Sequence, residues 1–451
     1  MTQLISTSVE SHAQPGIAAL RAESPVAKRA SYLFAGALFA GLLLRLIVAA
    51  VPGSAPRTPW GGGGDAATYL LLAHNLIQGK GYTYAGMPTA LRAPAYPLLL
   101  AGSLKLFGEH ALAAVRWLQF AEGLVVVLLC AAMARSLFGD TVGKITLLIA
   151  FFFPTLVEMN GEILTEAMAA LLVTICLYLL LRQLQEPRWI ILIALGVAIG
   201  LGILTRFNIV LIGFFLPAVA LLQRDNLSRW TGAALPMAVA LLVISPWLIR
   251  NFFAFHGAVL LSTGGGINAI QGIVTPQGRA LPGDAEKLRQ AVGWVPPVQI
   301  ETNNPSRMDL PSEPVLDRQC WKAAISIWQQ IGWGLFPVLL KKISYFWFST
   351  DQLFWTGSFV PIQRALRAAG VIIYWIFLAL AVAGWFRLRR IWPKLAIVSL
   401  GYAGWVTAFH LPFNMITRYR MPFIDPMVAV LAGAGVVTIM TRTRDNEHYA
   451  R

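Results

Sequence analysis

The chain has 451 residues, of which 57% are hydrophobic and 13% charged, whereas soluble globular proteins are roughly 45–50% apolar and about 25% charged, so an ordinary soluble enzyme is excluded. Its 15 Trp, 11 Tyr and 24 Phe lie among long apolar runs, which excludes a disordered chain and leaves a polytopic membrane protein. The net charge of +15 then indicates basic loops and anionic lipid surfaces, not nucleic acid, as the partners of the Lys and Arg residues.

Apolar segments long enough to cross a membrane follow one another along the chain. A transmembrane helix needs roughly 20 apolar residues, and by this measure we expect about ten spans. They lie near residues 31–52, 112–136, 141–157, 165–183, 189–205, 207–222, 231–249, 368–386, 394–411 and 422–440. We therefore predict an all-α fold, a polytopic transmembrane helix bundle.

The charges of the short loops predict the orientation of these spans. If the N-terminus is cytoplasmic, every inside loop is basic, as the positive-inside rule requires. The residues concerned are Arg135, Lys144, Arg182, Arg188, Arg224, Arg229, Arg387, Arg389, Arg390, Lys394, Arg442, Arg444 and Arg451. The turn from Glu158 to Thr165 on the other side has no Lys or Arg. We expect a multi-pass protein of the inner (cytoplasmic) membrane whose site faces the periplasm or the exterior.

Two further apolar segments are expected to lie in the membrane interface. Residues 94–107 are too short to span, and counting them would place the basic loops outside. Residues 321–350 alternate aromatic and Lys residues in the manner of an interfacial helix pair. The predicted organisation is a cytoplasmic tail (1–30), a membrane bundle (31–249) with the first outer loop (53–111), an outer loop with interfacial helices (250–367), C-terminal spans (368–440) and a second cytoplasmic tail (441–451).

The first outer loop contains a carboxylate directly after a run of glycines. Asp65 follows the tetraglycine 61–64, and glycines allow the backbone to approach a ligand closely. An aspartate at this point could act as a general base on a hydroxyl group. The alternative is that Asp65 caps a short helix.

Three glutamates precede the fourth span at a helical spacing. Glu158, Glu162 and Glu166 are at positions i, i+4 and i+8, so on one helix they would share a face. Their repulsion would then be offset by a raised pKa, a metal ion or a polar ligand. The alternative is a solvated loop in which the acids do not meet. Glu166 is the strongest candidate because an apolar span starts directly after it.

Basic residues lie close to the outer ends of the predicted spans. A guanidinium group can bind phosphate through two parallel hydrogen bonds, although any one of these arginines could instead extend to lipid headgroups. The set is Arg92, Arg206, Arg250, Arg418 and Arg420. Within the spans lie Arg45, Arg116 and Glu122, for which a polar cavity or mutual pairing is expected.

The sequence contains no nucleotide-binding motif. It lacks a P-loop and a dinucleotide fingerprint, so no nucleotide cofactor is expected. His74, His256 and His410 are not at the spacing of metal ligands. A divalent metal held by Asp65, Glu166 and a histidine is left open.

Short motifs lie in and beside the outer loops in a defined order. They are Asp65-Ala-Ala-Thr-Tyr69, Gly79-Lys-Gly-Tyr82, Pro88-Thr-Ala-Leu-Arg92-Ala-Pro-Ala-Tyr-Pro97, Phe107-Gly108, Leu164-Thr-Glu166, Pro246-Trp-Leu-Ile-Arg250-Asn251 and Thr417-Arg-Tyr-Arg-Met-Pro-Phe423. Their order and spacing resemble the GT-C superfamily of integral membrane glycosyltransferases, in particular the bacterial branch related to protein O-mannosyltransferases and to the lipid A aminoarabinose transferase. The resemblance covers roughly residues 31–265 and 410–440.

The resemblance implies a helix bundle whose first outer loop carries juxtamembrane helices over a cavity at the outer leaflet. It also implies a polyprenyl-phosphate-linked sugar as the donor. Asp65 matches the acidic residue of that loop, Glu166 matches the second acidic position, and Arg92 matches a basic residue that faces the lipid phosphate. The sequence departs from the pattern at Leu91, where relatives often have an acid.

These features predict a membrane glycosyltransferase that moves a sugar, with inversion, from a polyprenyl-phosphate donor to a lipid, glycan or protein acceptor. Asp65 and Glu166 are the expected catalytic residues, the five outer arginines bind the donor phosphate, and Glu158 and Glu162 are further acidic candidates. Membrane lipids are the other expected partners. The rival function is a lipid or polysaccharide transporter or flippase, in which the intramembrane charges would line the substrate path. A non-catalytic scaffold is disfavoured because anchoring does not require the outer acids and arginines.

Overall fold

The computed structural model describes residues 25–50, 65–222, 226–257, 259–274, 312–349, 360–413 and 415–449. Within these ranges the regular structure is helical except for one hairpin of β1 (Thr83–Tyr84) and β2 (Met87–Pro88). The predicted all-α class is therefore confirmed. The tetraglycine 61–64, residues 275–311 and 350–359 of the expected outer loop, and residues 1–24 and 450–451 of the expected tails lie outside the described residues.

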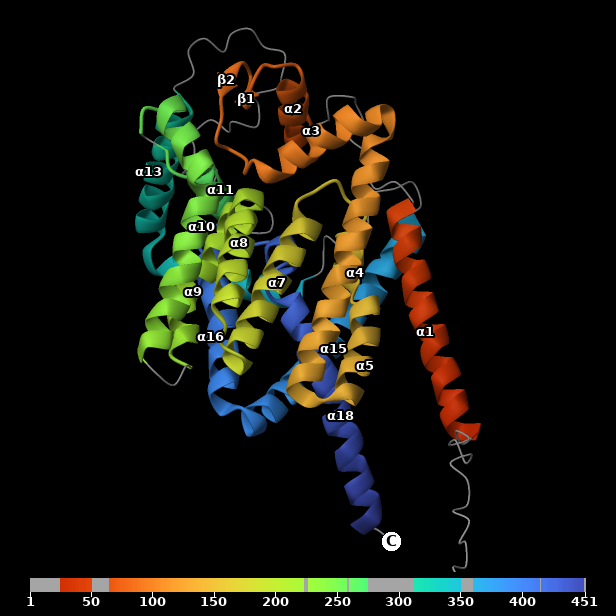
Figure 1. The fold of residues 1–451 in the computed structure, drawn as a ribbon. Helices are drawn as coiled ribbons and strands as arrows, with labels where there is room; N and C mark the ends of the chain where they lie inside the picture. Colours follow the sequence, from red (N-terminus) through yellow and green to blue (C-terminus); the bar gives the residue numbers. More distant parts are fainter. Residues whose placement is uncertain are drawn as a thin grey trace, which may run out of the picture.

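A helix lies at each of the ten predicted spans (Figure 1). In chain order the bundle contains α1 (Pro25–Ala50), α4 (Ala111–Phe138), α5 (Asp140–Phe152) with α6 (Pro154–Glu158), α7 (Glu166–Gln185), α8 (Trp189–Thr205), α9 (Val210–Ala220) after the 3₁₀ turn η2 (Phe207–Ile209), α10 (Asn226–Ala254), α15 (Val360–Ile391), α16 (Pro393–His410) and α18 (Asp425–Tyr449).

Length and composition alone identify helices that could cross a membrane. In the described chain, six are long and apolar enough, namely Lys28–Ala50, Ala95–Phe138, Glu166–Gln185, Trp230–Ala254, Glu313–Phe348 and Ala368–Ile391. Shorter apolar helices are Trp189–Thr205, Phe207–Ala220 and Asp425–Thr441. The helices of the bundle thus have the apolar character expected of a polytopic membrane protein.

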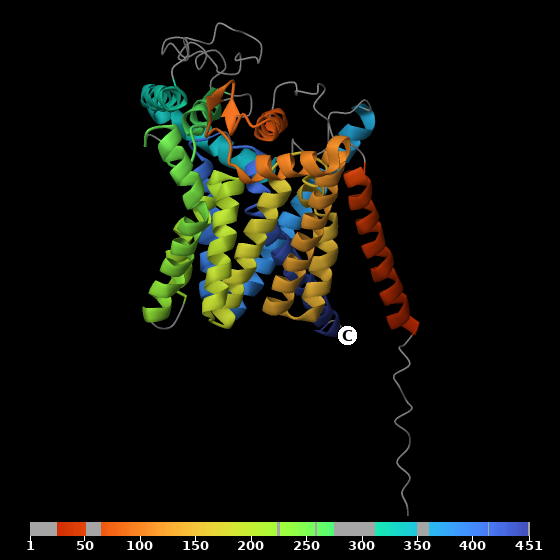
Figure 2. The same cartoon turned by 45° about the horizontal axis from the view of Figure 1, so that its top comes forward.

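Shorter helices lie at one end of the bundle, which we call the site end. There α2 (Asp65–Ile77) and the hairpin lie above the bundle, and α3 (Ala95–Phe107) runs crosswise over the ends of the bundle helices (Figure 2). This placement agrees with the prediction that residues 94–107 do not form a span. The remaining elements are η1 (Gly108–His110), α11 (Gly265–Val274), α13 (Glu313–Ile331), η6 (Gly332–Gly334), α14 (Leu335–Phe348) and α17 (Thr417–Arg420).

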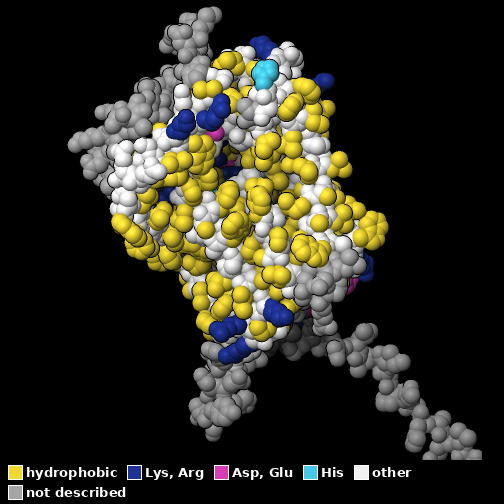
Figure 3. All heavy atoms as spheres, turned by 90° about the vertical axis from the view of Figure 1, so that its left-hand side faces the viewer, with side chains coloured by type: hydrophobic (Ala, Val, Ile, Leu, Met, Phe, Trp, Pro, Cys, Tyr) yellow, Lys and Arg dark blue, Asp and Glu magenta, His cyan; other side chains and the backbone are white. Residues whose placement is uncertain are grey.

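The charged loops separate the two ends of the bundle. The predicted basic residues lie in or near the connections from α4 to α5, from α7 to α8 and from α15 to α16, and all three connections lie opposite the site end (Figure 1). Figure 3 shows hydrophobic side chains over the middle of one face, with Lys and Arg side chains towards its two ends. This is the distribution expected when the apolar band lies in a bilayer.

Three helical segments differ in extent from the predicted spans. Helix α1 begins at Pro25 and α18 continues to Tyr449, so the predicted tails 1–30 and 441–451 are partly helical. The span predicted at 141–157 is broken at Phe153, whose backbone is extended. The break arises because the residue before a proline, here Pro154, is disfavoured in a helix.

Arg45 of α1 occupies this break. Its side chain is fully buried, and it donates hydrogen bonds to the carbonyl oxygens of Ala150 at 2.7 Å, Phe151 at 3.2 Å and Leu156 at 2.9 Å. A broken helix leaves carbonyl groups without helical partners, and a guanidinium can satisfy several of them at once. Arg45 therefore attaches α1 to the bundle, in place of the ion pair or polar cavity that we expected from the sequence.

Two glycines bring α15 and α18 into close contact. A Cβ atom at Gly384 would collide with the carbonyl oxygen of Leu431, and one at Gly435 would collide with that of Leu380. Small residues at such positions let two membrane helices approach at backbone distance.

The Gly384→Ala variant is expected to be less stable than the wild type, because the added methyl group meets a backbone atom that cannot rotate away. Overpacking costs typically about 1–3 kcal/mol. The measurement is the thermal unfolding midpoint of the purified protein in detergent. The control is Gly404→Ala in α16, where a Cβ atom has no neighbour within 4 Å. Equal midpoints for the two variants would contradict the close contact.

Candidate active site

Asp65 is the first residue of α2 and contacts an arginine from the following loop. The chain reverses after α2 at Gly79 and Gly81, which have φ values of +71° and +72° that glycine adopts without strain. The loop then brings Arg92 back, so that its Nη2 lies 2.5 Å from Oδ1 of Asp65. Tyr69, one turn after Asp65, lies beneath this guanidinium, with Cζ of Arg92 5.6 Å from the ring centroid. Asp65 and the aromatic ring together hold Arg92 in place.

The loop that carries Arg92 is fixed by segments from distant parts of the chain. Arg250 of α10 donates to the carbonyl oxygens of Thr89 and Tyr82, both at 2.8 Å. The backbone N–H of Ala90 donates to Glu313 of α13 at 3.0 Å. Arg250 therefore supports the loop through its backbone and forms no ion pair with Asp65 or Glu166.

Glu166 begins α7, where a negative charge is favoured by the helix dipole. The turn before it is held by Gln119 of α4, whose Nε2 donates to the carbonyl oxygens of Glu162 at 2.9 Å and Leu164 at 3.1 Å. Oε1 of Glu166 lies 2.7 Å from Nη1 of Arg206 and 2.7 Å from Nε of Arg418. Its side chain is 4% exposed, so the carboxylate is a buried counter-charge for both arginines.

Arg418 of α17 joins the two carboxylates. Its Nη2 lies 3.1 Å from Oδ2 of Asp65, while its Nε contacts Glu166. The structure thus brings Asp65, Arg92, Glu166, Arg206 and Arg418, from five separate segments, into one ion cluster at the site end. All five residues were predicted from the sequence as site residues; the way in which they pair was not.

The outer part of the ion cluster is accessible. The side chains of Asp65, Arg92 and Arg418 are 29%, 27% and 21% exposed. Near the site end, Figure 3 shows a hollow in which acidic and basic side chains are visible. The side chain of Arg92 is thus accessible to an anionic ligand, while its Nε is buried without a hydrogen-bond partner in the described chain.

The charges of the cluster determine how its members ionise. Burial alone raises the pKa of Asp65, but the charges of Arg92, Arg418 and Arg206 outweigh it and lower the pKa below the usual value. Burial likewise opposes the charge of Arg418, yet Glu166 and Asp65 raise its pKa. Asp65 is therefore ionised throughout the neutral range, and the cluster has one positive charge in excess.

Two of the predicted arginines, Arg250 and Arg420, lie outside the ion cluster. Arg250 binds backbone carbonyls, as described above. Arg420 is fully buried; it pairs with Asp425 at 3.0 Å and donates to the carbonyl oxygen of Phe346 at 2.7 Å. Its partners are those of a structural side chain that joins α14 to the start of α18.

The predicted common helical face of Glu158, Glu162 and Glu166 is wrong. Glu158 ends α6, Glu166 begins α7, and residues 159–165 between them form turns. The helical spacing is therefore not realised. Glu162 still lies close enough to Glu166 for an electrostatic effect, since burial and the charge of Glu166 raise its pKa.

Aromatic side chains support the ion cluster and were missed as site residues. Besides Tyr69, the ring of Tyr419 lies under Arg206, with Cζ 5.2 Å from the centroid, and stacks on His410 at 5.4 Å. Cation–π contacts of this kind orient a guanidinium. Their positions in the sequence could have indicated them as site residues, because Tyr69 is four residues after Asp65 and Tyr419 directly follows Arg418.

The ion cluster does not fit a divalent metal. In the described residues, no group of three or more His, Cys, Asp and Glu side chains is arranged to hold one. The oxygens of Asp65 and Glu166 accept from guanidinium groups, and three arginines around two carboxylates oppose a dication. The arrangement instead favours an anion beside Arg92 and Arg418.

Comparisons with known proteins identify related folds. Residues 91–249 match the model of the family described as dolichyl-phosphate-mannose-protein mannosyltransferase. Archaeal oligosaccharyltransferase AglB from Archaeoglobus fulgidus, in complex with an inhibitory peptide and a dolichol-phosphate, superposes with a TM-score of 0.53 at 14% identity, covering 93% of this chain and 52% of that one. Its apo form gives a TM-score of 0.54 at 15% identity, with coverage of 93% and 52%.

A further solved structure superposes less closely. ArnT from Cupriavidus metallidurans, bound to undecaprenyl phosphate, gives a TM-score of 0.39 at 17% identity, covering 91% of this chain and 78% of that one. No curated protein sequence matches the chain.

The chain spans about half the length of the oligosaccharyltransferase whose fold it shares. The superposition covers 93% of this chain, and the family match covers residues from the Arg92 loop to α10. In agreement with the resemblance noted in the sequence, the chain is similar over residues 91–249 to this mannosyltransferase family, and it shares its helical fold with the oligosaccharyltransferase.

Proposed function

We propose that the protein is a membrane glycosyltransferase that moves a sugar from a polyprenyl phosphate to a hydroxyl group of a lipid, glycan or protein. The observation that carries the proposal is the bridge formed by Arg418 between Asp65 and Glu166, with Arg92 and Arg206 on either side. This bridge joins an accessible carboxylate to an excess of positive charge at the site end of the bundle. A transfer from a lipid phosphate needs both.

The reaction is a single displacement. The acceptor oxygen forms a bond to the anomeric carbon while the bond from that carbon to the phosphate oxygen breaks, and the lipid phosphate leaves with the electron pair. Arg92 and Arg418 stabilise the negative charge that develops on the phosphate. Attack opposite the leaving group inverts the anomeric centre.

Asp65 takes the proton of the acceptor hydroxyl. It is the more exposed of the two carboxylates, and each of its oxygens keeps a lone pair besides the one that accepts from an arginine. A carboxylate with a lowered pKa is a weak base, so the proton moves late, once the new bond has made the hydroxyl acidic. Glu166 is buried and holds Arg206 and Arg418 in position.

The donor is a lipid, so the site must open towards the bilayer. The fold match to an oligosaccharyltransferase in complex with a dolichol-phosphate supports a polyprenyl phosphate, and the hollow in Figure 3 offers lateral access. Because the basic residues lie near the opposite end, the positive-inside rule supports our proposal that the site end faces the outside of the cytoplasmic membrane. Arg45 binds backbone carbonyls, so this one of the three intramembrane charges does not line a transport path.

The test of the function is product formation by the purified protein. Polyprenyl-phosphate sugars of several kinds are incubated with the protein and candidate acceptors, and glycosylated product and free polyprenyl phosphate are measured by mass spectrometry. Transfer requires both to appear together. A transporter forms no glycosidic bond, so a preparation that moves the lipid across vesicles without releasing polyprenyl phosphate would refute the proposal.

The Arg92→Ala variant is expected to weaken donor binding by about 1.5–3 kcal/mol, or roughly 10- to 150-fold in Kd, the worth of a charge-assisted hydrogen bond. Arg92→Lys should restore part of the lost donor affinity, because lysine keeps the positive charge but lacks the planar guanidinium group that forms two parallel hydrogen bonds. The measurement is a donor titration at saturating acceptor. Arg188→Ala, at the opposite end, is the control. If Arg92→Ala leaves the donor dependence unchanged, Arg92 does not bind the phosphate.

A further inference from the structure

A stack of aromatic rings ends at the ion cluster. The ring of His410, the last residue of α16, stacks on Phe346 of α14 with centroids 5.8 Å apart and on Tyr419 of α17 with centroids 5.4 Å apart. The guanidinium of Arg206 lies over the ring of Tyr419, with Cζ 5.2 Å from the centroid. His410 is buried, so it reaches no substrate itself, but one aromatic ring joins it to a member of the ion cluster.

The hydrogen bonds of His410 fix its protonation. Its Nδ1 lies 2.8 Å from the carbonyl oxygen of Val406, and since a carbonyl only accepts, Nδ1 carries a proton. Its Nε2 lies 3.1 Å from Nδ2 of Asn208, an amide nitrogen that only donates, so Nε2 accepts with its lone pair. No acid pairs with His410 in the part of the chain that the structure describes, and a buried charge without a counter-charge is unfavourable. The imidazole is therefore neutral, with its proton on Nδ1.

Both partners of this imidazole adjoin an arginine of the ion cluster. Asn208 is two residues after Arg206, and Tyr419 directly follows Arg418. The two arginines come from segments far apart in the chain, yet they contact the same oxygen of Glu166, each at 2.7 Å. Two like charges that share one oxygen repel each other, so their spacing has to be held by other contacts. The histidine links the two segments that carry them.

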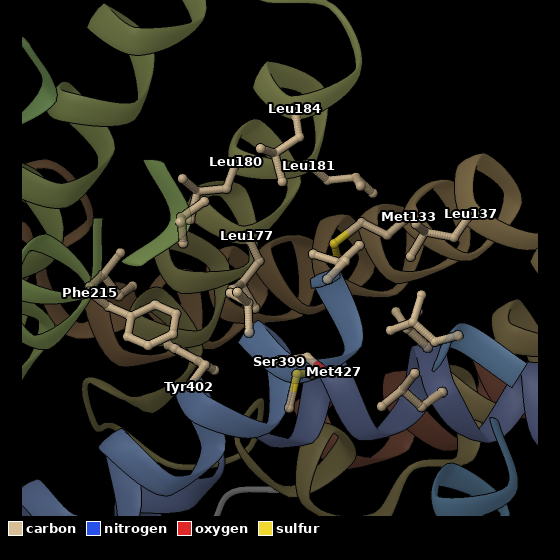
Figure 4. Close-up of a pocket in the computed structure, with 17 residues that line it drawn as sticks. Met133, Leu137, Leu177, Leu180, Leu181, Leu184, Phe215, Ser399, Tyr402 and Met427 are labelled. Carbon is tan, nitrogen blue, oxygen red and sulfur yellow. The ribbon is translucent and has the colours of Figure 1, made fainter. Parts of the chain in front are cut away.

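A second aromatic contact of α16 lies apart from the ion cluster and serves as a comparison. Tyr402 of α16 and Phe215 of α9 have ring centroids 5.4 Å apart, and Figure 4 shows both rings beside an apolar cavity. Among the described residues, no charged side chain lines this cavity. These rings therefore pack two helices together, whereas the stack through His410 ends at a cation of the ion cluster.

We propose that His410 is a positioning residue of the active site. As a neutral imidazole it accepts from Asn208 and stacks on Tyr419. These two contacts keep the neighbouring arginines at the spacing at which both bind Glu166, and so hold Arg418 against the leaving phosphate. The inference rests on the proposed function, because it assigns the histidine to that same site.

The test is steady-state kinetics of the full-length protein with a polyprenyl-phosphate sugar as the donor. His410→Phe keeps a ring in the stack but cannot accept from Asn208, so the spacing of the arginines should relax. We expect kcat to fall about tenfold to a hundredfold, since small misplacements of a catalytic group have effects of this size. The KM for the donor should stay nearly the same, because Arg92, which Asp65 holds, still binds the phosphate.

Two variants of α16 and α9 control for a loss of packing alone. Trp405→Phe removes a hydrogen bond of 3.2 Å to the carbonyl oxygen of Leu211, which joins the same two parts of the chain as the contact between His410 and Asn208. Phe215→Leu weakens the aromatic contact shown in Figure 4. Both controls should lower the thermal unfolding midpoint and leave kcat unchanged. If kcat falls in the controls as it does in His410→Phe, the histidine only packs the bundle.

A double-mutant cycle tests whether His410 acts through Asn208. Asn208→Ala removes the hydrogen-bond donor, so it should lower kcat by a factor similar to that of His410→Phe. The double variant should be no slower than the slower of the two single variants, because both changes remove the same hydrogen bond. Effects that multiply in the double variant would overturn the proposal, since the two residues would then act independently.

The protonation of His410 is measured without substrate, by ¹⁵N NMR of protein labelled at its six histidines. The signals lost in His410→Phe identify the residue. The wild type should show the neutral tautomer with its proton on Nδ1. Asn208→Asp, which places a carboxylate beside Nε2, should show the imidazolium and a lower kcat, because the new positive charge lies next to the stack that carries Arg206.

The outcomes separate this role from the function itself. An imidazolium or an Nε2–H tautomer in the wild type overturns the positioning role alone. So does an active wild type whose kcat is unchanged in His410→Phe. A wild type that forms no glycosylated product from any donor refutes the proposed function, and the role of His410 with it.

Discussion

The Asp65→Asn variant is expected to transfer sugar at least about a hundredfold more slowly than the wild type, which is the usual scale of general-base catalysis. Asparagine has nearly the same shape, so the fold of α2 is retained. The amide cannot take the acceptor proton, and it removes the charge that Arg92 and Arg418 share at 2.5 and 3.1 Å. The measurement is kcat at saturating donor and acceptor.

The matched control for this variant is Asp140→Asn. Asp140 also pairs with an arginine at 2.5 Å, but it is 69% exposed and lies at the opposite end of the bundle. Its replacement should leave transfer unchanged. Wild-type turnover by Asp65→Asn would show that Asp65 only begins the helix.

The same assignment predicts the dependence of transfer on pH. Because the arginines lower the pKa of Asp65 below its usual value of 3.8, its carboxylate stays ionised as the pH falls through the range in which an ordinary aspartate is protonated. Activity that depends on this charge is lost only below that folded-state pKa. When kcat is measured as a function of pH, the fall in kcat on the acid side that is due to protonation of Asp65 should therefore not occur above about pH 4.

The second large effect is expected from Glu166→Gln. This change removes the counter-charge of two arginines, each at 2.7 Å from the same oxygen of a side chain that is 4% exposed. Breaking a buried ion pair by removing one partner costs about 3–5 kcal/mol, because the remaining charge is left buried. We expect a lower unfolding midpoint and, since Arg418 loses one of its two anchors, a lower kcat as well.

The chain contains a surface counterpart that serves as a control. Glu186 also contacts two arginines, Arg182 and Arg188, both at 3.1 Å, but it is 48% exposed. Exposed pairs are worth about 0–1 kcal/mol, so Glu186→Gln should hardly change the midpoint. Comparable losses in both variants would mean that burial does not strengthen the Glu166 contacts.

Sequence patterns predicted the bundle well because each pattern is local. Apolar length sets the position of a span, and loop charge sets its direction, which is why a helix lies at every predicted span. The errors have local causes as well. Pro154 breaks the span predicted at 141–157, and the turn after Glu158 separates acids whose spacing suggested one helical face.

The site was predicted as a set of residues but not as an arrangement. Arg250, Arg418 and Arg420 are the same residue type near span ends, yet only Arg418 contacts Asp65 and Glu166. Arg250 and Arg420 bind backbone carbonyls instead. Which partner a guanidinium finds depends on tertiary contacts between segments far apart in the chain, and periodicity and charge contain no information about these contacts.

Under the proposed function, the hydrogen bonds that hold the Arg92 loop make donor affinity depend on remote segments. Arg250 and Glu313 hold residues 89 and 90 from positions 161 and 223 residues further along the chain. A small displacement of α13 would therefore move the guanidinium of Arg92 relative to the lipid phosphate. In the proposed transferase, substitutions in α13 that touch neither substrate would in this way adjust how strongly the donor is held, so evolution could retune it to a different lipid-linked sugar while the ion cluster itself stays intact.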